Sequence, residues 1–384
     1  MLTVQAVTDP ESLWRLCSEW EDLDAELSPR LPFTGPLWNM LWWRHMPSDN
    51  IYVRDSFYAH VVRDAASRLI AVAPMMLTRR PRSRLFPLRE LGFFGADPNM
   101  TEIRGLACRP ADQYRAMLAL SAYFIERDKN WDWLKWGGIH KDAHLAGELD
   151  DSISLRAVKD VPDYYLRLPR SWDELKAGLS RNTKEALRKC YNSLKRDGHA
   201  FTFRVIDRPD ESAAAISRFF LLHKARAARA DMVRHRDVFA AEKSRRFLRD
   251  YAHAMAERDS LRVFEILVAG KVVASRIGFV FGKELYLYYS GFNPDWSKYS
   301  IMTTVVAEAI KWAVDQRFDI VNLSTGNDPS KLRWGPQETL YRQGVLVAPT
   351  LRGQLAFAAY SGGLALSQTN EYGGFLSGLR RSYA

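Results

Sequence analysis

The stretch GFNPDWSKYSIMTTVVAEAIKWAVDQ, residues 291–316, decides how this sequence is interpreted. A tyrosine-rich segment, ELYLYYSGF at 284–292, leads into a polar loop, and an apolar stripe at helical spacing follows from Ile301 to Ala313. This pattern predicts a strand, a loop and an amphipathic helix that packs on a sheet. The first amides of a helix lack internal acceptors and lie at the positive end of its dipole, so such a junction can hold a phosphate.

The same junction is also compatible with a loop that binds nothing. Neither GxxxxGK[ST] nor GxGxxG occurs in the chain, so a P-loop nucleotidase and a Rossmann dehydrogenase are disfavoured. The surrounding segments therefore have to distinguish a binding loop from a simple connection.

Three strand-like segments precede the loop, at 261–268, 271–281 and 284–292. Tight turns at Ala269-Gly270 and Gly282-Lys283 join them into an antiparallel meander. A further strand, FDIVNLS at 318–324, follows the helix. This order predicts an α+β fold with a mixed sheet, mostly antiparallel and flanked by helices, rather than a doubly wound parallel sheet.

The first half of the chain repeats part of this pattern. HVVRDAASRLIAVAPMML at 60–77 and EILVAGKVVASRIGFV at 265–280 both describe a strand, a short turn and a returning strand. We therefore expect two similar halves, at 1–160 and 161–348, with a helix and a tail at 349–384. A capping box, Ser171 with Glu174, predicts a helix that ends near Gly198.

Composition limits the class of protein. The 55 basic and 45 acidic residues give a net charge of +10, which favours anionic partners. The three cysteines lack zinc-ligand spacing, which predicts a reducing compartment and no metal. No apolar run approaches the roughly 20 residues of a membrane helix, and the N-terminus is unlike a secretory signal, so we expect a cytoplasmic protein.

The order of meander, loop, helix and strand resembles the GNAT acetyltransferase superfamily. The closer resemblance is to its CelD-like branch, related to FemAB-type transferases with two GNAT halves. KYSIM at 298–302 resembles the branch's YSPG motif, with Ile301 and Met302 where Pro-Gly is usual. Further similar segments over residues 30–345 are FTGPLWNMLWWRHM (33–46), LRELGFFG (88–95), Leu222-His223 with Arg226, and NLSTGNDPSKLRWG (322–335).

The resemblance implies an acyl-CoA-dependent N- or O-acyltransferase in which an amine or hydroxyl attacks the thioester directly. The residues expected to bind the acyl-CoA are Tyr289, Ser290, Ser297, Lys298, Tyr299, Ser300, Met302 and Thr303. The expected catalytic residues are Asp328 as the base, Tyr288 as a proton donor, and Lys331. The expected substrate residues are Arg276, His223 and Ser324.

Each of these residues also has a structural interpretation. Asp328 suits an ordinary turn, Tyr288 suits sheet packing, and His223 suits a buried core position. The sequence does not choose between the two interpretations.

The resemblance also implies an acceptor, a sugar or amino sugar in cell-surface polysaccharide assembly, and association with a membrane-bound polysaccharide synthase, but no DNA. A FemAB-like transfer from aminoacyl-tRNA is an alternative. A basic helix with Arg181, Lys184, Arg188 and Lys195 favours it, although a solvated helix face has the same composition. A third alternative is a catalytically silent partner of a synthase.

Overall fold

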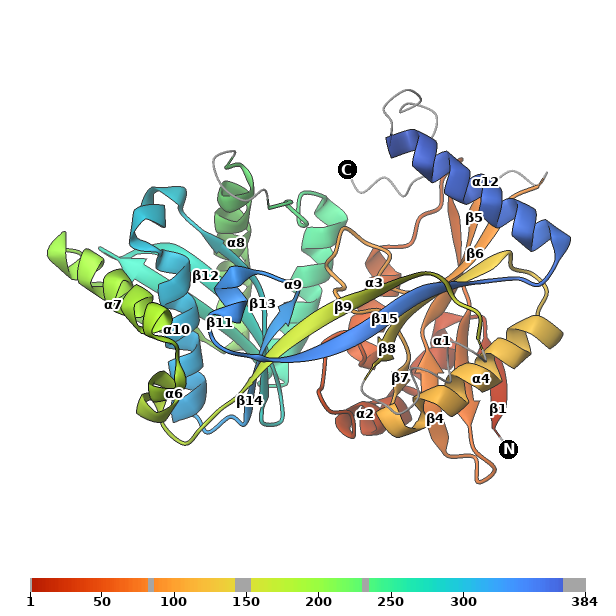
Figure 1. Cartoon of the computed structure of the whole chain (residues 1–384), viewed down its shortest axis with the longest axis horizontal. Helices are drawn as coiled ribbons and strands as arrows, with labels where there is room; N and C mark the ends of the chain where they lie inside the picture. The colour runs from red at the N-terminus through yellow and green to blue at the C-terminus, as the bar shows by residue number, and fades with distance from the viewer. Residues whose placement is uncertain (1, 82–85, 142–152, 230–234, 369–384) are drawn as a thin grey trace. The chain divides into compact units, whose positions relative to one another are not determined.

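The computed structural model describes residues 2–81, 86–141, 153–229 and 235–368 (Figure 1). Internal contacts divide them into two compact units. Unit 1 contains the described residues up to Val161 and those from Thr339 onward, and unit 2 spans Pro162–Glu338. Residues 339–347, which the sequence analysis placed with the second half, therefore group with unit 1.

Unit 1 contains two sheets. The smaller sheet is antiparallel and has the order β1-β3-β4-β7, with bounds Thr3–Val7, Ala59–Arg63, Leu69–Ala73 and Ala107–Cys108. The other strands of this unit have the order β15-β8-β6-β5-β2, with bounds Gln337–Val347, Trp133–His140, Leu88–Phe93, Met75–Arg80 and Arg54–Phe57.

The described helices of unit 1 are α1 (Pro10–Trp14), α2 (Cys17–Ala25), α3 (Pro36–His45), α4 (Pro110–Glu126) and α12 (Leu351–Gln368). Residues 15–16 separate α1 from α2. Helix α4 buries Met117, Leu120 and Phe124 against the strands because these residues recur at helical spacing. Arg352 ties α12 to β8, since its Nε donates to Asp132 Oδ1 over 3.0 Å.

Unit 2 contains the meander predicted from the sequence. Its strands have the order β10-β11-β12-β13-β14-β9, with bounds Phe201–Ile206, Leu261–Val268, Lys271–Phe281, Glu284–Phe292, Ile320–Thr325 and Arg156–Arg167. All neighbours are antiparallel except β13 and β14, which are parallel. The predicted α+β class with a mixed, mostly antiparallel sheet is confirmed.

The helices of unit 2 are α6 (Trp172–Gly178), α7 (Arg181–Arg196), α8 (Pro209–Ala227), α9 (Glu242–Glu257), α10 (Ile301–Asp315) and α11 (Pro329–Leu332), with a 3₁₀ helix, η1 (Pro294–Tyr299), before α10. The helix start predicted at Ser171 is confirmed, because Ser171 Oγ accepts from the Glu174 amide over 3.2 Å and is the N-cap of α6. The single helix expected between residues 171 and 198 is wrong. A second cap, Ser180 accepting from the Thr183 amide, starts a separate helix.

The two faces of this sheet carry different helices. On one face, Val305, Ala309 and Ile310 of α10 pack with strand residues in a common core. On the other face lies α8, and Gly291 of β13 makes this close approach possible. A Cβ at Gly291 would stand 2.3 Å from the backbone nitrogen of His223, so only glycine allows the α8 backbone to lie there.

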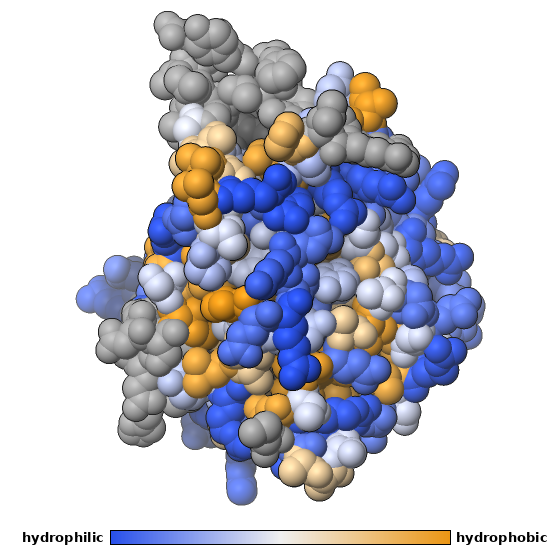
Figure 2. All heavy atoms as spheres, turned by 90° about the vertical axis from the view of Figure 1, so that its right-hand side faces the viewer, coloured by the Kyte–Doolittle hydropathy of each residue, from blue (hydrophilic) through white to orange (hydrophobic). Residues whose placement is uncertain are grey.

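The outer surface is mainly hydrophilic. Figure 2 shows one face, on which hydrophobic side chains are scattered among hydrophilic ones. Within the described part of the chain, no helix has the length and apolarity needed to cross a membrane.

Candidate functional site

The parallel strands β13 and β14 separate after three residue pairs. Their ladder ends at Tyr286 and Asn322, although both strands continue. Beyond that point β13 pairs with β12, and Thr325 of β14 pairs with Asp163 of β9. No described ladder pair joins β13 to β14 in this region, so the two backbone edges leave a gap between them.

A β-bulge lies on β13 where the strands separate. Arg276 pairs with Ser290, but Gly278 pairs with Leu287, so β13 has one residue more than β12 over this interval. The extra residue falls at 288–289, the two tyrosines. Nη2 of Arg276 donates to the carbonyl of Leu287 over 2.9 Å and braces the bulge.

The bulge places both tyrosine rings on the α8 face. Their ring centroids are 4.7 Å apart. Tyr288 also contacts Phe279, and Tyr289 contacts His223 and Phe239. In a regular strand, consecutive side chains would point to opposite faces. The bulge thus changes the direction of the backbone amides beside the gap.

The start of α10 lies beside this gap. Ser300 precedes the helix in a left-handed conformation, with φ 53° and ψ 40°. The amides of Thr303 and Thr304 donate to the Ser300 carbonyl over 2.8 and 3.3 Å. The amides of Ile301 and Met302 have no acceptor among the described residues. Ile301 is 0% exposed, whereas Met302 is partly exposed. The Met302 amide, at the positive end of the helix, is therefore the accessible candidate for an anion.

The missing family glycine has a structural explanation. Met302, which stands at that position, lies inside regular α10, so its backbone does not require glycine. The left-handed conformation falls on Ser300 instead. The Met302 side chain packs partly buried against the core, so only its amide faces an incoming anion.

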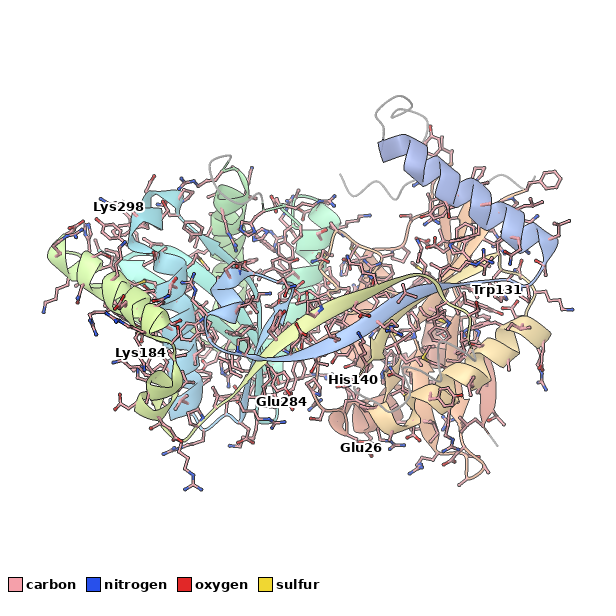
Figure 3. The ribbon with its side chains drawn as sticks, in the orientation of Figure 1. Glu26, Trp131, His140, Lys184, Glu284 and Lys298 are labelled. Atoms are coloured by element: carbon pink, nitrogen blue, oxygen red, sulfur yellow. The ribbon has the colours of Figure 1, made fainter. Side chains whose placement is uncertain are left out.

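Cations surround this helix start. Nη1 of Arg333 donates to Thr303 Oγ1 over 3.3 Å, and Nη1 of Arg229 donates to Ser297 Oγ over 2.9 Å. The Lys298 ammonium lies 4.8 Å from the centre of the Tyr299 ring. Figure 3 labels Lys298, in the loop before α10, and Lys184, on α7.

The Tyr299 side chain connects the loop before α10 to the end of α7. Its hydroxyl donates to Asp197 Oδ2 over 3.0 Å and lies 3.1 Å from Nε2 of His199. Both partners lie at the end of α7, and only 4% of Tyr299 is exposed. The sequence-predicted residue Tyr299 therefore supports the loop between α7 and α10 and does not enter the gap.

On the α8 face, two side chains hold Ser290. The ring Nδ1–H of His223 donates to the Ser290 carbonyl over 3.0 Å, and Nη1 of Arg226 donates to Ser290 Oγ over 2.8 Å. His223 is 3% exposed among aromatic rings, so it reaches a substrate only through the residues it positions. Nη2 of Arg226 lies 2.8 Å from Nε2 of His235.

The loop after β14 supplies the remaining predicted residues. Asp328 accepts from the Ser330 amide over 2.8 Å and caps α11. Nζ of Lys331 donates to Ser324 Oγ over 3.3 Å and to the Thr325 carbonyl.

The electrostatic environment keeps Asp328 ionised. Burial raises the pKa of Asp328, but the hydrogen bonds from Ser330 and the charges of Lys331 and Arg226 outweigh burial and lower this pKa below its ordinary value.

The predicted site residues form two groups and one outlier. Ser297, Ser300 and Thr303 lie at the α10 start. Ser290 lies on β13, and Ser324, Asp328 and Lys331 lie on β14 and in the segment that follows it. Arg276 is the outlier. It shares a strand face with Gly278, whose added Cβ would lie 2.9 Å from Phe264 in the α10-side core.

Sequence reasoning assigned no role to four residues of this site. Arg226 and Arg333 lie in the segments that carry the family resemblance, so these motifs contained a signal for them. Arg229 and His235 had no such signal, because only the fold brings them to the loop before α10 and to Arg226.

Comparisons with known proteins agree with this geometry. Residues 181–332 match a family model described as an acetyltransferase (GNAT) domain. The structure is similar to the crystal structure of FemX, with a TM-score of 0.57 and 11% identity over 88% of this chain and 96% of that chain.

Two further solved structures are similar. One is the C-terminal domain (DUF2156) of a protein described as a lysylphosphatidylglycerol synthetase from Agrobacterium fabrum, with a TM-score of 0.50 and 12% identity over 91% of this chain and 95% of that chain. A tandem GNAT protein from the clavulanic acid biosynthesis pathway has a TM-score of 0.47 and 12% identity, over 91% and 98% of the two chains. A comparison with functionally curated proteins gave no match.

These findings define the class of protein. Residues 181–332 match the GNAT acetyltransferase domain, and the fold is GNAT-like and mixed α/β. The predicted enzyme class, an acyltransferase of the GNAT type, is confirmed.

Proposed function

We propose that this protein transfers an acyl group directly from an acyl-CoA to an amine or hydroxyl acceptor, with the thioester arm in the gap between β13 and β14. The observation that carries this proposal is the end of the parallel ladder at Tyr286 and Asn322, together with a helix start whose first two amides have no acceptor among the described residues. An extended amide-containing arm can form in this gap the hydrogen bonds that a further strand would form.

The α10 start suits the pyrophosphate of the donor. The amides of Ile301 and Met302, the hydroxyls of Ser300 and Thr303, and the Arg333 guanidinium all lie at this end of the helix. Ser297, with Arg229 bound to it, and Lys298 extend the polar and positively charged surface along the loop. This combination of helix dipole, amides and cations is what a diphosphate requires.

The chemistry follows from the residues on both sides of the gap. The acceptor nitrogen or oxygen forms a bond to the thioester carbon, and the carbon–sulfur bond breaks. Asp328 takes the proton from the acceptor, and Tyr288 or Lys331 returns a proton to the leaving thiolate. The backbone amides at the bulge, near Tyr289 and Ser290, stabilise the charge that develops on the carbonyl oxygen.

For the acceptor, we propose a sugar or amino sugar in cell-surface polysaccharide assembly, with a membrane-bound synthase as an associated protein. The CelD-like motifs at KYSIM (298–302) and NLSTGNDPSKLRWG (322–335) support this part of the proposal. Ser324, on β14, suits a hydroxyl-rich acceptor because its hydroxyl is polar and its Oγ already accepts a hydrogen bond from Lys331 Nζ over 3.3 Å. We propose that Arg276 and His223 do not contact the substrate. Both bind backbone carbonyls of β13, those of Leu287 and Ser290, and so position this strand.

Titration calorimetry with acetyl-CoA tests the donor site. Wild-type protein should bind acetyl-CoA, and Arg333→Gln should weaken binding about tenfold because it removes a cation from the pyrophosphate site. Lys311→Gln is a matched control, since it removes the same charge from the exposed, far part of α10. Absence of heat and of thermal stabilisation at millimolar acetyl-CoA would contradict the proposal.

A second candidate is transfer from aminoacyl-tRNA. Helix α7 favours it, because Arg181, Arg188, Lys189, Lys195 and Arg196 are all exposed on one helix, with Glu185 and Asp197 as partial counterions. The fold similarity to FemX supports it as well. Replacement of Arg188 and Lys189 by Glu should abolish tRNA binding, and wild-type binding should fall steeply between 50 and 200 mM salt. Salt-insensitive binding would contradict an electrostatic tRNA site.

A catalytically silent partner of a synthase remains the third candidate. It predicts stable co-purification with another protein and no acyl transfer. Turnover with any amine or hydroxyl acceptor would exclude it.

A further inference from the structure

We propose that Arg226 forms an anion-binding subsite on the acceptor side of the transfer site, so that the acceptor carries a carboxylate or phosphate group near its nucleophile. This inference rests on the proposed acyl transfer and specifies the chemical class of its acceptor.

The position of Arg226 places a guanidinium directly at the bulge. Its Nη1 donates to Ser290 Oγ over 2.8 Å, and Ser290 lies on β13 at the edge of the gap. Its Nη2 lies 2.8 Å from Nε2 of His235. The charge of Asp328, the proposed base, acts on Arg226 electrostatically. A group bound to Arg226 would therefore lie near Ser290 and within the electrostatic range of the proposed base.

The charge of Arg226 lacks a direct counterion. Among the described residues, no carboxylate lies within 4.0 Å of this guanidinium, and both of its hydrogen-bond partners are uncharged oxygen or imidazole groups. Arg226 is partly buried, and burial lowers the pKa of Arg226 more than the charge of Asp328 raises it. A partly buried cation without a direct carboxylate partner is stabilised when an anion binds.

Another part of the same unit shows how the chain usually compensates such charges. Arg218, two turns earlier on α8, donates from Nε to Glu265 Oε1 over 2.9 Å. Arg204 pairs with the same buried carboxylate over 2.5 Å. Arg204 and Arg218 thus share a carboxylate on β11, whereas no carboxylate of the described residues lies within 4.0 Å of the Arg226 guanidinium.

The remaining donors of Arg226 suit an oxyanion. A guanidinium has more N–H groups than the contacts with Ser290 and His235 use. The planar fork matches a carboxylate or a phosphate, and both have this recognition chemistry in common. A neutral acceptor would leave the charge without a counterion, so the subsite should select against it.

Matched pairs of acceptors test the inference. With acetyl-CoA as donor, we compare amine acceptors that bear a free carboxylate or a phosphate with their neutral amide or methyl-ester forms. Wild-type protein should prefer the anionic member in kcat/KM, and Arg226→Gln should reduce that preference by about 10- to 100-fold. Arg226→Lys should retain part of it. The separate carboxylate and phosphate series show which anion the subsite accepts.

A binding measurement keeps the test independent of the acceptor. With coenzyme A saturating, added succinate or inorganic phosphate should raise the Tm of the wild type, and this increase should be lost in Arg226→Gln. Lys224→Gln is the matched control, because Lys224 is exposed on the same helix two residues away. It should keep the anion effect.

Two results would overturn the inference: no anion-dependent stabilisation or selectivity in the wild type, or the same effect in Arg226→Gln. If coenzyme A itself does not bind, the proposed acyl transfer fails. The anion titration without coenzyme A then still decides whether Arg226 forms the subsite, through the same comparison of Arg226→Gln with Lys224→Gln.

Discussion

At the scale of single residues, Asp328 carries the most specific prediction. Asp328→Asn keeps the cap on α11, since asparagine is an equally good N-cap, but removes the proposed base. We expect kcat to fall about 10²- to 10⁴-fold, with little change in acetyl-CoA affinity. A steady-state assay together with calorimetry checks both. An unchanged kcat would remove Asp328 from the mechanism.

The pH dependence of catalysis follows from the same carboxylate. The pKa of Asp328 is lowered, so the base is ionised throughout the neutral range. If Asp328 alone determined the pH dependence, kcat/KM would stay constant from neutral pH down to the ordinary aspartate pKa of 3.8. It would fall only at lower pH, as the carboxylate becomes protonated. A pH–rate profile with a break above pH 6 that disappears in Asp328→Asn would contradict this.

His60 provides a prediction for stability. Neither ring nitrogen has a hydrogen-bond partner among the described residues, and burial lowers the pKa of His60 to about 3. The unfolded chain, with a histidine pKa of 6.5, then binds more protons than the folded one. The free energy of unfolding should therefore fall below pH 6.5, by about 1.4 kcal/mol per pH unit, until the folded pKa is reached.

The measurement is denaturant unfolding between pH 4 and 7. His60→Phe should flatten the slope, because phenylalanine fits among Tyr58, Tyr123 and Phe124 without gaining charge. Substitution of the exposed His253 by Gln controls for the loss of an imidazole. An unchanged slope in His60→Phe would show that other groups determine the acid sensitivity.

At the scale of elements, the contact between α8 and β13 depends on one missing side chain. Gly291→Ala should push the α8 backbone away from the strand, because the new Cβ would stand 2.3 Å from the His223 nitrogen. We expect a loss of roughly 1–3 kcal/mol or more, together with reduced activity, since His223 and Arg226 hold Ser290.

Thermal unfolding and the acyl-transfer assay measure these two effects. Gly178→Ala is the control, because nothing lies within 4 Å of its added Cβ. This variant should keep wild-type activity. Equal stability of the two variants would mean that the helix moves without cost.

The elements also show what could be predicted from the sequence. The meander was predictable because Gly270 and Gly282, both with positive φ, mark its turns between clear strand patterns. The bulge could not be predicted, because the sequence around the two tyrosines contains no pattern that indicates a register shift of one residue. The break between α6 and α7 was missed because Leu179-Ser180 fits a helical pattern, and only the backbone reveals the second cap.

The candidate site was predicted only in part, for a related reason. Residues of the loop before α10 are close in sequence, so one motif identified Ser297, Ser300 and Thr303 together. Arg226 and Asp328 are far apart in sequence, and the fold, in which α8 packs on β13, brings them within electrostatic range of each other. A pattern within a single segment cannot predict such a long-range interaction.

At the scale of the whole molecule, the chain has two compact units with separate cores. Ile310→Ala in α10 and Leu120→Ala in α4 each remove a side chain that is 0% exposed, one in each core. Each should cost about 2–5 kcal/mol in its own unit. Calorimetry should show two transitions, each lowered mainly by one variant. A single transition lowered equally by both would contradict independent cores.

The early end of the β13–β14 ladder has a consequence beyond catalysis. Two facing backbone edges accept any extended chain with regularly spaced amides, whatever its side chains. A short peptide in that conformation would act as a decoy strand and displace the donor, which a competition titration against acetyl-CoA would reveal. For the proposed acyl-CoA donor, selectivity over such a peptide would therefore depend on the diphosphate group, which only the donor presents to the N-terminus of α10.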